Sequence, residues 1–515
     1  MLGAPHSHVA VIDLGSNSVR VVIYRVDPHG GVREVENVKR ALRLGGRLDA
    51  AGCLSADARE DFLACLRQFR GLLEAWRVSA VTAVATAVFR QAADGPEVLE
   101  AGERVLGHPI RLLPGEEEAR YGVVGVLETT DFEDALVVDL GGASVELTAV
   151  RGRQIEAAVS LPFGAVTLTE RFLAGRDERV GYEALTAFLE GALAGHPWIA
   201  GVLGPVIAVG GSARSIGRVH LGRRLAGLAG LHQHRVPAAD IRRLGQEVVA
   251  VSAAARADTL ELAAERAELL PAALAVFDAA LGPRRDALVV CGAGLREGIL
   301  FEKLRALRGE PRPASMVVEA AERLLLGFDG DLPHARQVAR LACELLDGLR
   351  GAGLAVGGPS SRRVLEAAGL LRGLGQVMGV QGFEAFTLPM VLRSGLAGLS
   401  AENRARTALV AAFKNGKLLK AALADMKPLV QSGQAPELET LGAILLLAEA
   451  LDRTRRQAVR AVRVEDQGGA LRLRLVTVEP QPLELTLLDE PLQRLGKMLR
   501  RPLALVVDSE VELNA

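Results

Sequence analysis

Apolar and polar positions in the N-terminal part of the chain follow the periods of strands and helices in turn. Residues 9–40 alternate in short runs that predict two or three strands, whereas Ser55–Trp76 has apolar residues at helical spacing behind a serine suited to cap a helix. Short apolar runs follow at 206–209 and 287–291. Strands that alternate with helices are typical of α/β architecture. From residue 314 onward the pattern becomes that of amphipathic helices.

Two segments are near copies of each other. His8–Val26 and Asp134–Arg151 each contain an apolar strand that ends in Asp-Leu-Gly, a turn of small polar residues and a second, alternating strand. Glycine in such a turn lets the backbone approach a ligand, and the N–H groups of the turn can point at an anion. The copies place Asp13 and Asp139 at equivalent points, which predicts a duplicated lobe with two facing phosphate-binding hairpins.

Composition limits the classes of protein that fit. The chain has 515 residues, of which 49% are hydrophobic, enough for roughly three or four domains. Its 61 basic and 62 acidic residues nearly cancel, so the net charge favours neither nucleic acid nor a membrane as partner, and we expect neither. The four cysteines lie far apart without metal-ligand spacing, and the first residues lack the basic segment of a signal peptide. We therefore expect a cytoplasmic protein.

The pattern divides the chain into four expected domains. Two α/β lobes are expected at 1–125 and 126–307. A stretch rich in Gly, Pro and Arg then opens a helical domain at 308–458. Alternating segments such as LRLRLVTV and LELTLL predict a small α/β domain at 459–515.

Short motifs recur in a fixed order along the N-terminal part. They are Asp13–Ser18, Arg90, Gly115–Arg120, Asp139–Glu146, Gly210–Ser212 and Leu295–Gly298. In this order and spacing they resemble the exopolyphosphatase and guanosine pentaphosphate phosphohydrolase family, the Ppx/GppA phosphatases. The resemblance implies duplicated actin-like lobes with ribonuclease H-like sheets, followed, as in the long bacterial members, by an all-α HD-like domain and a small α/β cap. It also implies a homodimer.

Hydrolysis of a phosphoanhydride needs a bound phosphoryl group, neutralised charge and an activated water. The resemblance assigns catalysis to Glu118 and Arg90, and the planar fork of an arginine suits phosphate oxygens. Asp139, at a strand end, is suited to hold Mg²⁺ or Mn²⁺ with Glu146 on the next strand, and a monovalent cation such as K⁺ is a further candidate cofactor. Phosphate binding is expected from Asp13, Gly15, Ser16, Asn17, Ser18, Gly141, Gly142, Ser144, Gly210, Gly211 and Ser212.

These residues also have plainer interpretations. Glu116, Glu117 and Glu118 could simply stabilise a helix N-terminus, where acidic side chains are favoured by the helix dipole. Asp13 and Asp139 could be ordinary turn formers. The surrounding motifs favour catalysis for Glu118 and a dipole or solvent role for the other two glutamates.

The sequence departs from the family pattern in two places. Ala143 stands where the second hairpin usually has glycine, and an alanine would strain the turn by about 1 kcal/mol or more if that position had a positive φ. Ala213 and Arg214 stand where a Gly-Thr pair is more usual, so Arg214 could clash with a nucleotide or add a cation for a phosphate tail. We expect Arg296 and Glu297 to anchor the last helix of the second lobe.

The C-terminal region lacks the histidines that an HD-type metal site needs. The last of the nine histidines is His334, so no such site is expected in 335–515. The region is locally basic instead, which is usual for solvated helix faces. As a hypothesis, a cationic track for long polyphosphate is formed by Arg404, Arg406, Lys414, Lys417 and Lys420.

The motifs and the resemblance together predict a metal-dependent exopolyphosphatase that releases orthophosphate from the end of polyphosphate. A guanosine pentaphosphate 5′-phosphohydrolase is the first alternative, because both substrates present a terminal phosphoanhydride. A polyphosphate- or nucleotide-binding regulator with weakened catalysis is the second, because of the departures at Ala143 and Arg214. An ATP-using kinase is disfavoured by the glutamate in the predicted helix 116–127.

Overall fold

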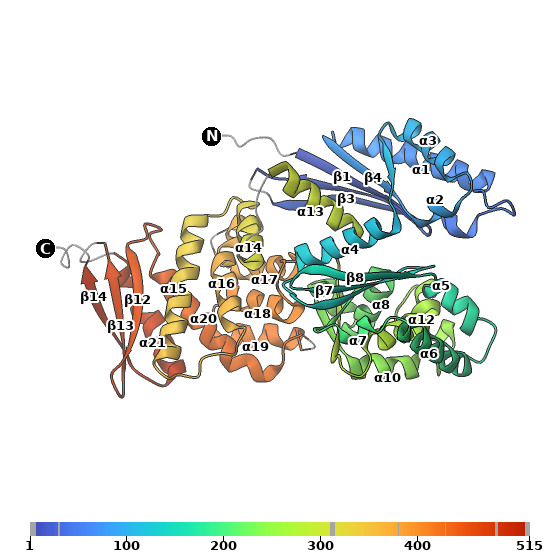
Figure 1. Cartoon of the computed structure of the whole chain (residues 1–515). Coiled ribbons are helices and arrows are strands. Elements are labelled where there is room, and N and C mark those ends of the chain that lie inside the picture. The colour runs from blue at the N-terminus through green and yellow to red at the C-terminus, as the bar shows by residue number, and fades with distance from the viewer. Residues whose placement is uncertain are drawn as a thin grey trace. The chain divides into compact units, whose positions relative to one another are not determined.

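A computed structural model of the chain describes most of its length. The described residues are 7–28, 31–308, 315–379, 381–427, 429–478 and 483–509. They form two compact units, an N-terminal unit of Met1–Arg223 with Leu231–Arg312 and a C-terminal unit of Arg224–Gly230 with Pro313–Ala515 (Figure 1). None of the helices in the described residues combines the length and the apolar character that a membrane crossing requires.

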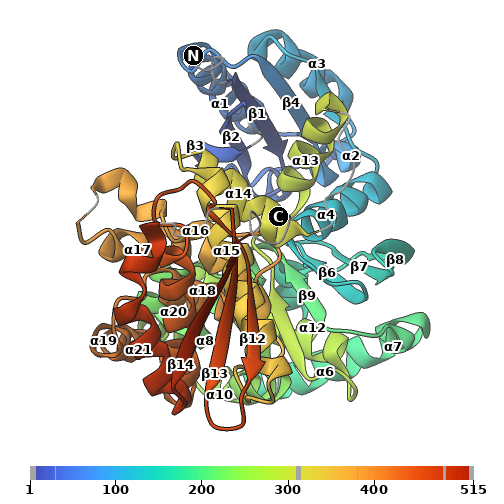
Figure 2. The same cartoon turned by 90° about the vertical axis from the view of Figure 1, so that its left-hand side faces the viewer.

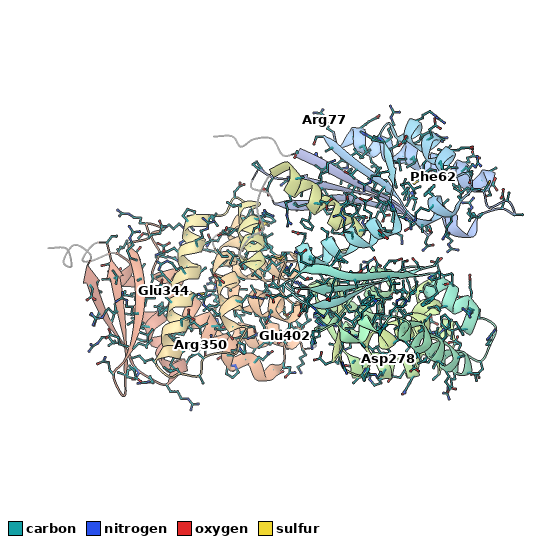
Figure 3. The ribbon with its side chains drawn as sticks, viewed as in Figure 1. Phe62, Arg77, Asp278, Glu344, Arg350 and Glu402 are labelled. Atoms are coloured by element: carbon teal, nitrogen blue, oxygen red, sulfur yellow. The ribbon has the colours of Figure 1, made fainter. Side chains whose placement is uncertain are left out.

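The first lobe of the N-terminal unit is a five-stranded sheet covered by helices (Figure 2). Ser55 accepts a hydrogen bond from the N–H of Ala58 and so starts α1 where the sequence predicts it. Phe62 points from α1 into the layer between helix and sheet and is fully buried, whereas Arg77 points outward (Figure 3). The strands, in the order β3-β2-β1-β4-β5, are β1 Ser7–Leu14, β2 Val19–Val26, β3 Val32–Arg40, β4 Ala80–Ala85 and β5 Ile110–Leu112. The helices are α1 Ala56–Ala75, α2 Ala87–Gln91, α3 Gly95–Leu106 and α4 Gly115–Thr129, with a short 3₁₀ turn at Leu44–Gly46.

The second lobe repeats the strand connectivity of the first. Its strands are β6 Ala135–Leu140, β7 Val145–Arg151, β8 Gln154–Leu161, β9 Val206–Val209, β10 His234–Pro237 and β11 Ala287–Val290. In the order β8-β7-β6-β9-β11, the first three strands are antiparallel and the next two parallel, as in β3-β2-β1-β4-β5, and β10 adds an edge. The expected duplicated actin-like lobes are therefore confirmed. The helices are α5 Ala165–Leu168, α6 Glu178–Ala194, α7 Trp198–Gly201, α8 Gly210–Leu221, α10 Ala238–Val248, α11 Ala253–Thr259 and α12 Ala264–Leu281, and a π-helical turn covers Thr169–Leu173.

Helix α13 (Leu295–Arg308) follows β11 but packs on the first lobe, against α4 and β1. Its Ile299, Leu300 and Leu304 belong to one core with side chains of β1 and β2. The second lobe was expected at 126–307, and two elements at its ends pack differently from that expectation. The expected boundary at 125/126 lies inside α4, and the last helix returns to the first lobe because its apolar face is buried there.

The C-terminal unit is helical with a three-stranded sheet, as expected. Ala229 in α9 (Arg223–Ala229) belongs to this unit, because its carbonyl accepts from the buried guanidinium of Arg404 at 2.7 Å. The other helices are α14 Met316–Leu326, α15 Leu332–Gly351, α16 Ser361–Leu371, α17 Glu384–Arg393, α18 Ala401–Ala411, α19 Gly416–Asp425, α20 Ala435–Ala450 and α21 Asp489–Leu499, with 3₁₀ turns at Leu374–Met378, Ser432–Gln434 and Leu483–Leu487. The strands, in the order β12-β13-β14, are β12 Val459–Asp466, β13 Leu471–Thr477 and β14 Leu503–Ser509.

The alternating segment at 483–487 is not a strand. It forms a 3₁₀ turn in which Leu483 and Leu487 are exposed and Glu484 is buried. The Glu484 carboxylate accepts from the backbone N–H of Thr454 at 3.2 Å and from its hydroxyl. A polar contact thus reverses the burial that the alternation predicts.

Candidate active site

The two Asp-Leu-Gly hairpins have the same backbone turn. The N–H of Gly15 donates to the carbonyl of Ser18 at 3.2 Å, and that of Gly141 donates to the carbonyl of Ser144 at 3.0 Å. A Cβ on either glycine would lie 3.1 Å from that carbonyl oxygen, so both turns need a small residue at this position. Ala143 is not among the described residues with a positive φ, so the condition for strain in the second turn is not met.

The two hairpins differ in the charge that faces each aspartate. Asp13 pairs across the strands with Arg20, whereas Asp139 pairs at the equivalent position with Glu146. Burial raises the pKa of Asp13, and Arg296 and Arg20 oppose this; Arg296 Nη1 lies 3.4 Å from Asp13 Oδ2. The first hairpin is therefore close to neutral.

The second hairpin concentrates negative charge. Burial and the carboxylates of Glu146 and Glu118 raise the pKa of Asp139 to about 7. Such a pair of hard oxygen donors fits Mg²⁺, which commonly binds one or two carboxylates and takes its other ligands from water and phosphate. Among the described residues no group of three or more His, Cys, Asp or Glu side chains is arranged to hold a metal, so Asp139 and Glu146 could supply only part of a coordination shell.

Glu118 lies in the first turn of α4 and contacts Arg90 of α2. Arg90 Nη1 lies 2.9 Å from Glu118 Oε2 and also donates to the carbonyl of Leu113 at 2.6 Å. Burial raises the pKa of Glu118, the bond from Arg90 lowers it, and the carboxylates of Glu146 and Asp13 raise it further. Its neighbour Glu117 pairs instead with Arg111. The two neighbouring glutamates thus have different partners, and Glu118 is the one that faces the hairpins.

The third predicted phosphate loop meets the second hairpin. Gly210 begins α8 with a φ of 99°, and a Cβ there would lie 3.1 Å from Asp139 Oδ1 and 3.1 Å from the carbonyl oxygen of Leu140. A Cβ on Gly211 would lie 2.8 Å from the guanidinium of Arg266, and Ser212 is buried. The N-terminus of α8 therefore adjoins the Asp139 carboxylate, and this close approach explains the glycine at 210.

A group of cations around the hairpins was not predicted as a site. Arg20, Lys39, Arg214, Arg266 and Arg296, which we call the basic cluster, are close enough that burial and the four arginines lower the pKa of Lys39. The Nε of Arg296 is buried without a hydrogen-bond partner in the described part of the chain. Arg296 was expected only to anchor a helix, and Arg214 was considered only by itself, as a cation for a phosphate tail or a clash with a nucleotide. The five residues come from unrelated strands and helices, so no sequence spacing joins them.

The predicted polyphosphate track is not supported at its first two residues. Arg404 and Arg406 are buried; Arg404 donates to the carbonyls of Leu392 and Ala229, and Arg406 pairs with Glu437. They cannot line a surface, because their guanidinium groups satisfy interior acceptors. Of the three exposed lysines, Lys414 lies 4.0 Å from Glu384 and Lys420 lies 3.7 Å from Glu439, and Lys417 is exposed on α19.

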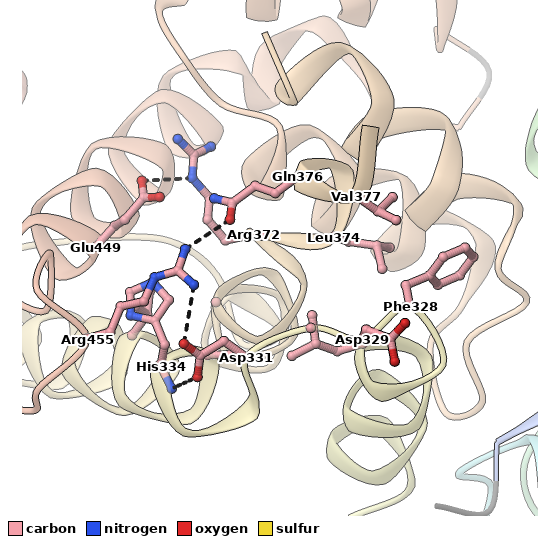
Figure 4. Close-up of a pocket in the computed structure, with 16 residues that line it drawn as sticks. Phe328, Asp329, Asp331, His334, Arg372, Leu374, Gln376, Val377, Glu449 and Arg455 are labelled. Carbon is pink, nitrogen blue, oxygen red and sulfur yellow. Dashed lines mark hydrogen bonds and ion pairs between the residues drawn. The ribbon is translucent and has the colours of Figure 1, made fainter. Parts of the chain in front are cut away.

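The C-terminal unit contains a pocket of about 370 Å³ (Figure 4). Arg372 lies 3.1 Å from Glu449, and Arg455 lies 3.3 Å from Asp331. His334, the last histidine of the chain, places Nδ1 2.8 Å from Asp452 Oδ2. The charges that line the pocket are thus largely paired with one another. An HD-like origin of this unit stays a prediction.

The fold and the site together define a class of protein. Two α/β lobes with the same strand connectivity each present a glycine-containing hairpin turn. A half-buried carboxylate, an arginine and a helix N-terminus lie beside these turns. This is the architecture of actin-like proteins that act on phosphoryl groups.

The comparison with known families places the chain within that class. A model of the Ppx/GppA phosphatase family matches residues 22–307, more than half of the chain. The chain therefore belongs to the Ppx/GppA phosphatase family, whose members are phosphoanhydride hydrolases. The C-terminal unit lies beyond the residues that the family model matches.

Solved structures agree with this assignment. The chain is similar to the Aquifex aeolicus member of the Ppx/GppA family, with 26% identity, a TM-score of 0.54, and coverage of 59% of this chain and 99% of that one. It is similar to an exopolyphosphatase-like protein, with 25% identity, a TM-score of 0.50 and the same two coverages. An exopolyphosphatase from Cytophaga hutchinsonii shares the fold, with 21% identity, a TM-score of 0.51, and coverage of 58% of this chain and 98% of that one.

Proposed function

We propose that the protein is an exopolyphosphatase, which hydrolyses the terminal phosphoanhydride bond of inorganic polyphosphate and releases orthophosphate. The observation that carries the proposal is the pairing of two matched hairpin turns with a half-buried glutamate, Glu118, beside them. Turn N–H groups bind phosphate oxygens, and a carboxylate held next to them can act on water.

The reaction needs one bond to form and one to break. The oxygen of a water attacks the terminal phosphorus, the bridging P–O bond breaks, and its electron pair stays on the bridging oxygen, which becomes the new end of the shortened chain. Glu118 takes the proton of the attacking water. Its raised pKa favours this role, because a carboxylate that is more basic than usual accepts a proton more readily.

Arg90 and the hairpin turns hold the phosphoryl group. Arg90 has the planar fork that matches two phosphate oxygens, and its contacts with Glu118 and the Leu113 carbonyl fix its position. Asp139 and Glu146 would hold a Mg²⁺ ion. When bound, the metal would supply positive charge to the phosphate oxygens and make a nearby water more acidic.

The basic cluster supports polyphosphate as the substrate. Polyphosphate carries negative charge on every phosphate beyond the terminal one, and the basic cluster places cations from both lobes around the hairpins. Guanosine pentaphosphate presents the same terminal bond and is the alternative that the experiment below decides. A homodimer and a cytoplasmic location remain proposals that rest on the family resemblance and the composition.

The test is orthophosphate release from long polyphosphate, guanosine pentaphosphate and ATP, with Mg²⁺, by the wild type and by Glu118→Gln. We expect fastest release from polyphosphate and a loss of about 10²- to 10⁴-fold in Glu118→Gln, the usual contribution of a general base. The matched control is Glu117→Gln on the same turn, which removes a pair with Arg111 that is partly exposed and should leave the rate unchanged.

Each other outcome overturns a stated part of the proposal. Release that is unaffected by Glu118→Gln refutes the role of Glu118 as base. Faster release from guanosine pentaphosphate than from polyphosphate makes the protein a nucleotide phosphohydrolase. The absence of release from all three substrates favours the regulator.

A further inference from the structure

Arg214 projects toward the second hairpin from the first turns of α8. Gly210, the first residue of α8, faces the Asp139 carboxylate, and Arg214 lies one helical turn later, on the same face. Side chains of an α-helix slant toward its N-terminus, so that of Arg214 extends back toward the sheet edge where Asp139 lies. The position of Arg214 thus follows from backbone geometry.

The surroundings of Arg214 are charged. Its strongest electrostatic partners are Arg296, Glu297, Asp139 and Arg20. It is half-buried, and within the residues that the structure describes its side chain makes no hydrogen bond or ion pair. The buried Arg256 differs, because it donates to the carbonyl groups of Ala267, Val248 and Val251. A guanidinium has five donors and no acceptor, so Arg214 presents unused donors at a phosphate site.

Arg214 and Glu118 both lie near Asp139, but their other charged neighbours differ. The strongest partners of Glu118 are Arg90, Glu146 and Asp13, whereas Arg214 adjoins Asp139 together with Arg296 and Arg20. A polyphosphate that has its terminal phosphate beside Glu118 and runs past Asp139 would therefore place its next phosphate near Arg214 and the basic cluster.

We infer that Arg214 binds the phosphate next to the one that is released, and so neutralises the negative charge that develops on the leaving-group oxygen. This inference rests on the proposed function for its consequence in catalysis, but not for the binding itself. The residue stands where the family usually has a small Gly-Thr pair, so the inference concerns a property of this chain. Lysine should replace Arg214 poorly, because a single ammonium group cannot donate to two phosphate oxygens in a plane.

The experiment compares binding of tripolyphosphate with binding of orthophosphate, by titration calorimetry with Mg²⁺, for the wild type, Arg214→Gln and Arg214→Lys. Orthophosphate has no second phosphate, so we expect both variants to bind it as the wild type does. We expect Arg214→Gln to bind tripolyphosphate about 10- to 100-fold more weakly, the usual range for a lost charge-assisted hydrogen bond, and Arg214→Lys to fall between. The matched control is Arg218→Gln, one turn further along α8, where the arginine is exposed.

Three results with the variants would overturn the inference. Arg214→Gln could bind tripolyphosphate like the wild type. It could lose affinity for both ligands equally, which would show a general effect on the site. Arg218→Gln could weaken tripolyphosphate binding as much, which would show a nonspecific effect of charge. A wild type that binds tripolyphosphate but releases no orthophosphate refutes the proposed function alone, and the comparison of Arg214→Gln with the wild type still decides the inference. A wild type that binds no tripolyphosphate refutes both.

Discussion

Replacing Gly298 by alanine should disturb the crossing of α4 and α13. A Cβ at this position would lie 1.9 Å from the carbonyl oxygen of Tyr121 and 3.0 Å from the N–H nitrogen of Gly125, both in α4. The same crossing brings Gly125 against Gly294, the residue before α13, where a Cβ would lie 2.3 Å from the carbonyl oxygen of Gly294. Two helices therefore touch backbone to backbone, which only glycine allows at this distance.

The size of the effect follows from these distances. A Cβ contact below 3.0 Å is essentially never found, so the 1.9 Å contact is 1.1 Å too short, by subtraction, and α4 and α13 must separate by about that much. Forcing an extra methyl group into a packed contact costs about 1–3 kcal/mol of stability. Tyr121 lies one turn after Glu118, so the shift also moves the proposed base, and a displacement of about 1 Å can lower kcat by about 10²-fold.

Two measurements on Gly298→Ala test this reasoning. Urea unfolding followed by circular dichroism should show a lower midpoint, and orthophosphate release from polyphosphate should show a lower kcat. The matched control is Gly191→Ala in α6, where a Cβ meets nothing within 4 Å and alanine should stabilise the helix by about 1 kcal/mol. A Gly298→Ala protein with an unchanged midpoint and an unchanged kcat would refute the close crossing and its role in placing Glu118.

Two further substitutions test single residues. Arg372→Ala should destabilise the C-terminal unit by about 3–5 kcal/mol, because it leaves the partly buried Glu449 without its arginine. The control Arg362→Ala, at an exposed ion pair, should cost at most about 1 kcal/mol. Equal urea midpoints for the two variants would contradict this expectation. Gly210→Ala should lower the free energy of unfolding by about 1–2 kcal/mol, because Gly210 has a positive φ. It should also lower the kcat for polyphosphate, because the new Cβ displaces Asp139. A variant with wild-type stability and turnover would show that the contact between Gly210 and Asp139 does not matter.

Much of the fold could be predicted from the sequence, because it depends on local patterns of residues. Ser55 predicted the start of α1, and the structure shows its capping bond. The likeness of the two Asp-Leu-Gly segments predicted two lobes, and the strand orders confirm it. The alternating segment 483–487 forms a 3₁₀ turn rather than a strand, because a contact with Thr454 buries Glu484 while Leu483 and Leu487 are exposed. The return of α13 to the first lobe was also missed, because the sequence does not show which core a helix joins.

Of the site, only the residues within short motifs could be predicted from the sequence. Asp13, Asp139 and Glu118 lie in short motifs, so their residue types could be interpreted one at a time. The basic cluster could not be found in this way, because Lys39 and Arg266 are far apart in the sequence and meet only in the folded lobes. The burial of Arg404 and Arg406 was missed for the same reason, since their partners lie on other elements.

The sequence by itself determined that two hairpin turns of one chemistry occur in this chain, each with an aspartate before a glycine. Only the tertiary structure decided that they differ in charge, with Asp13 facing Arg20 and Asp139 facing Glu146. The physical reason is that a turn is set by a few adjacent residues, whereas charges act strongly only across a few ångströms of poorly hydrated space. Folding creates that proximity, and it makes one hairpin nearly neutral and the other acidic.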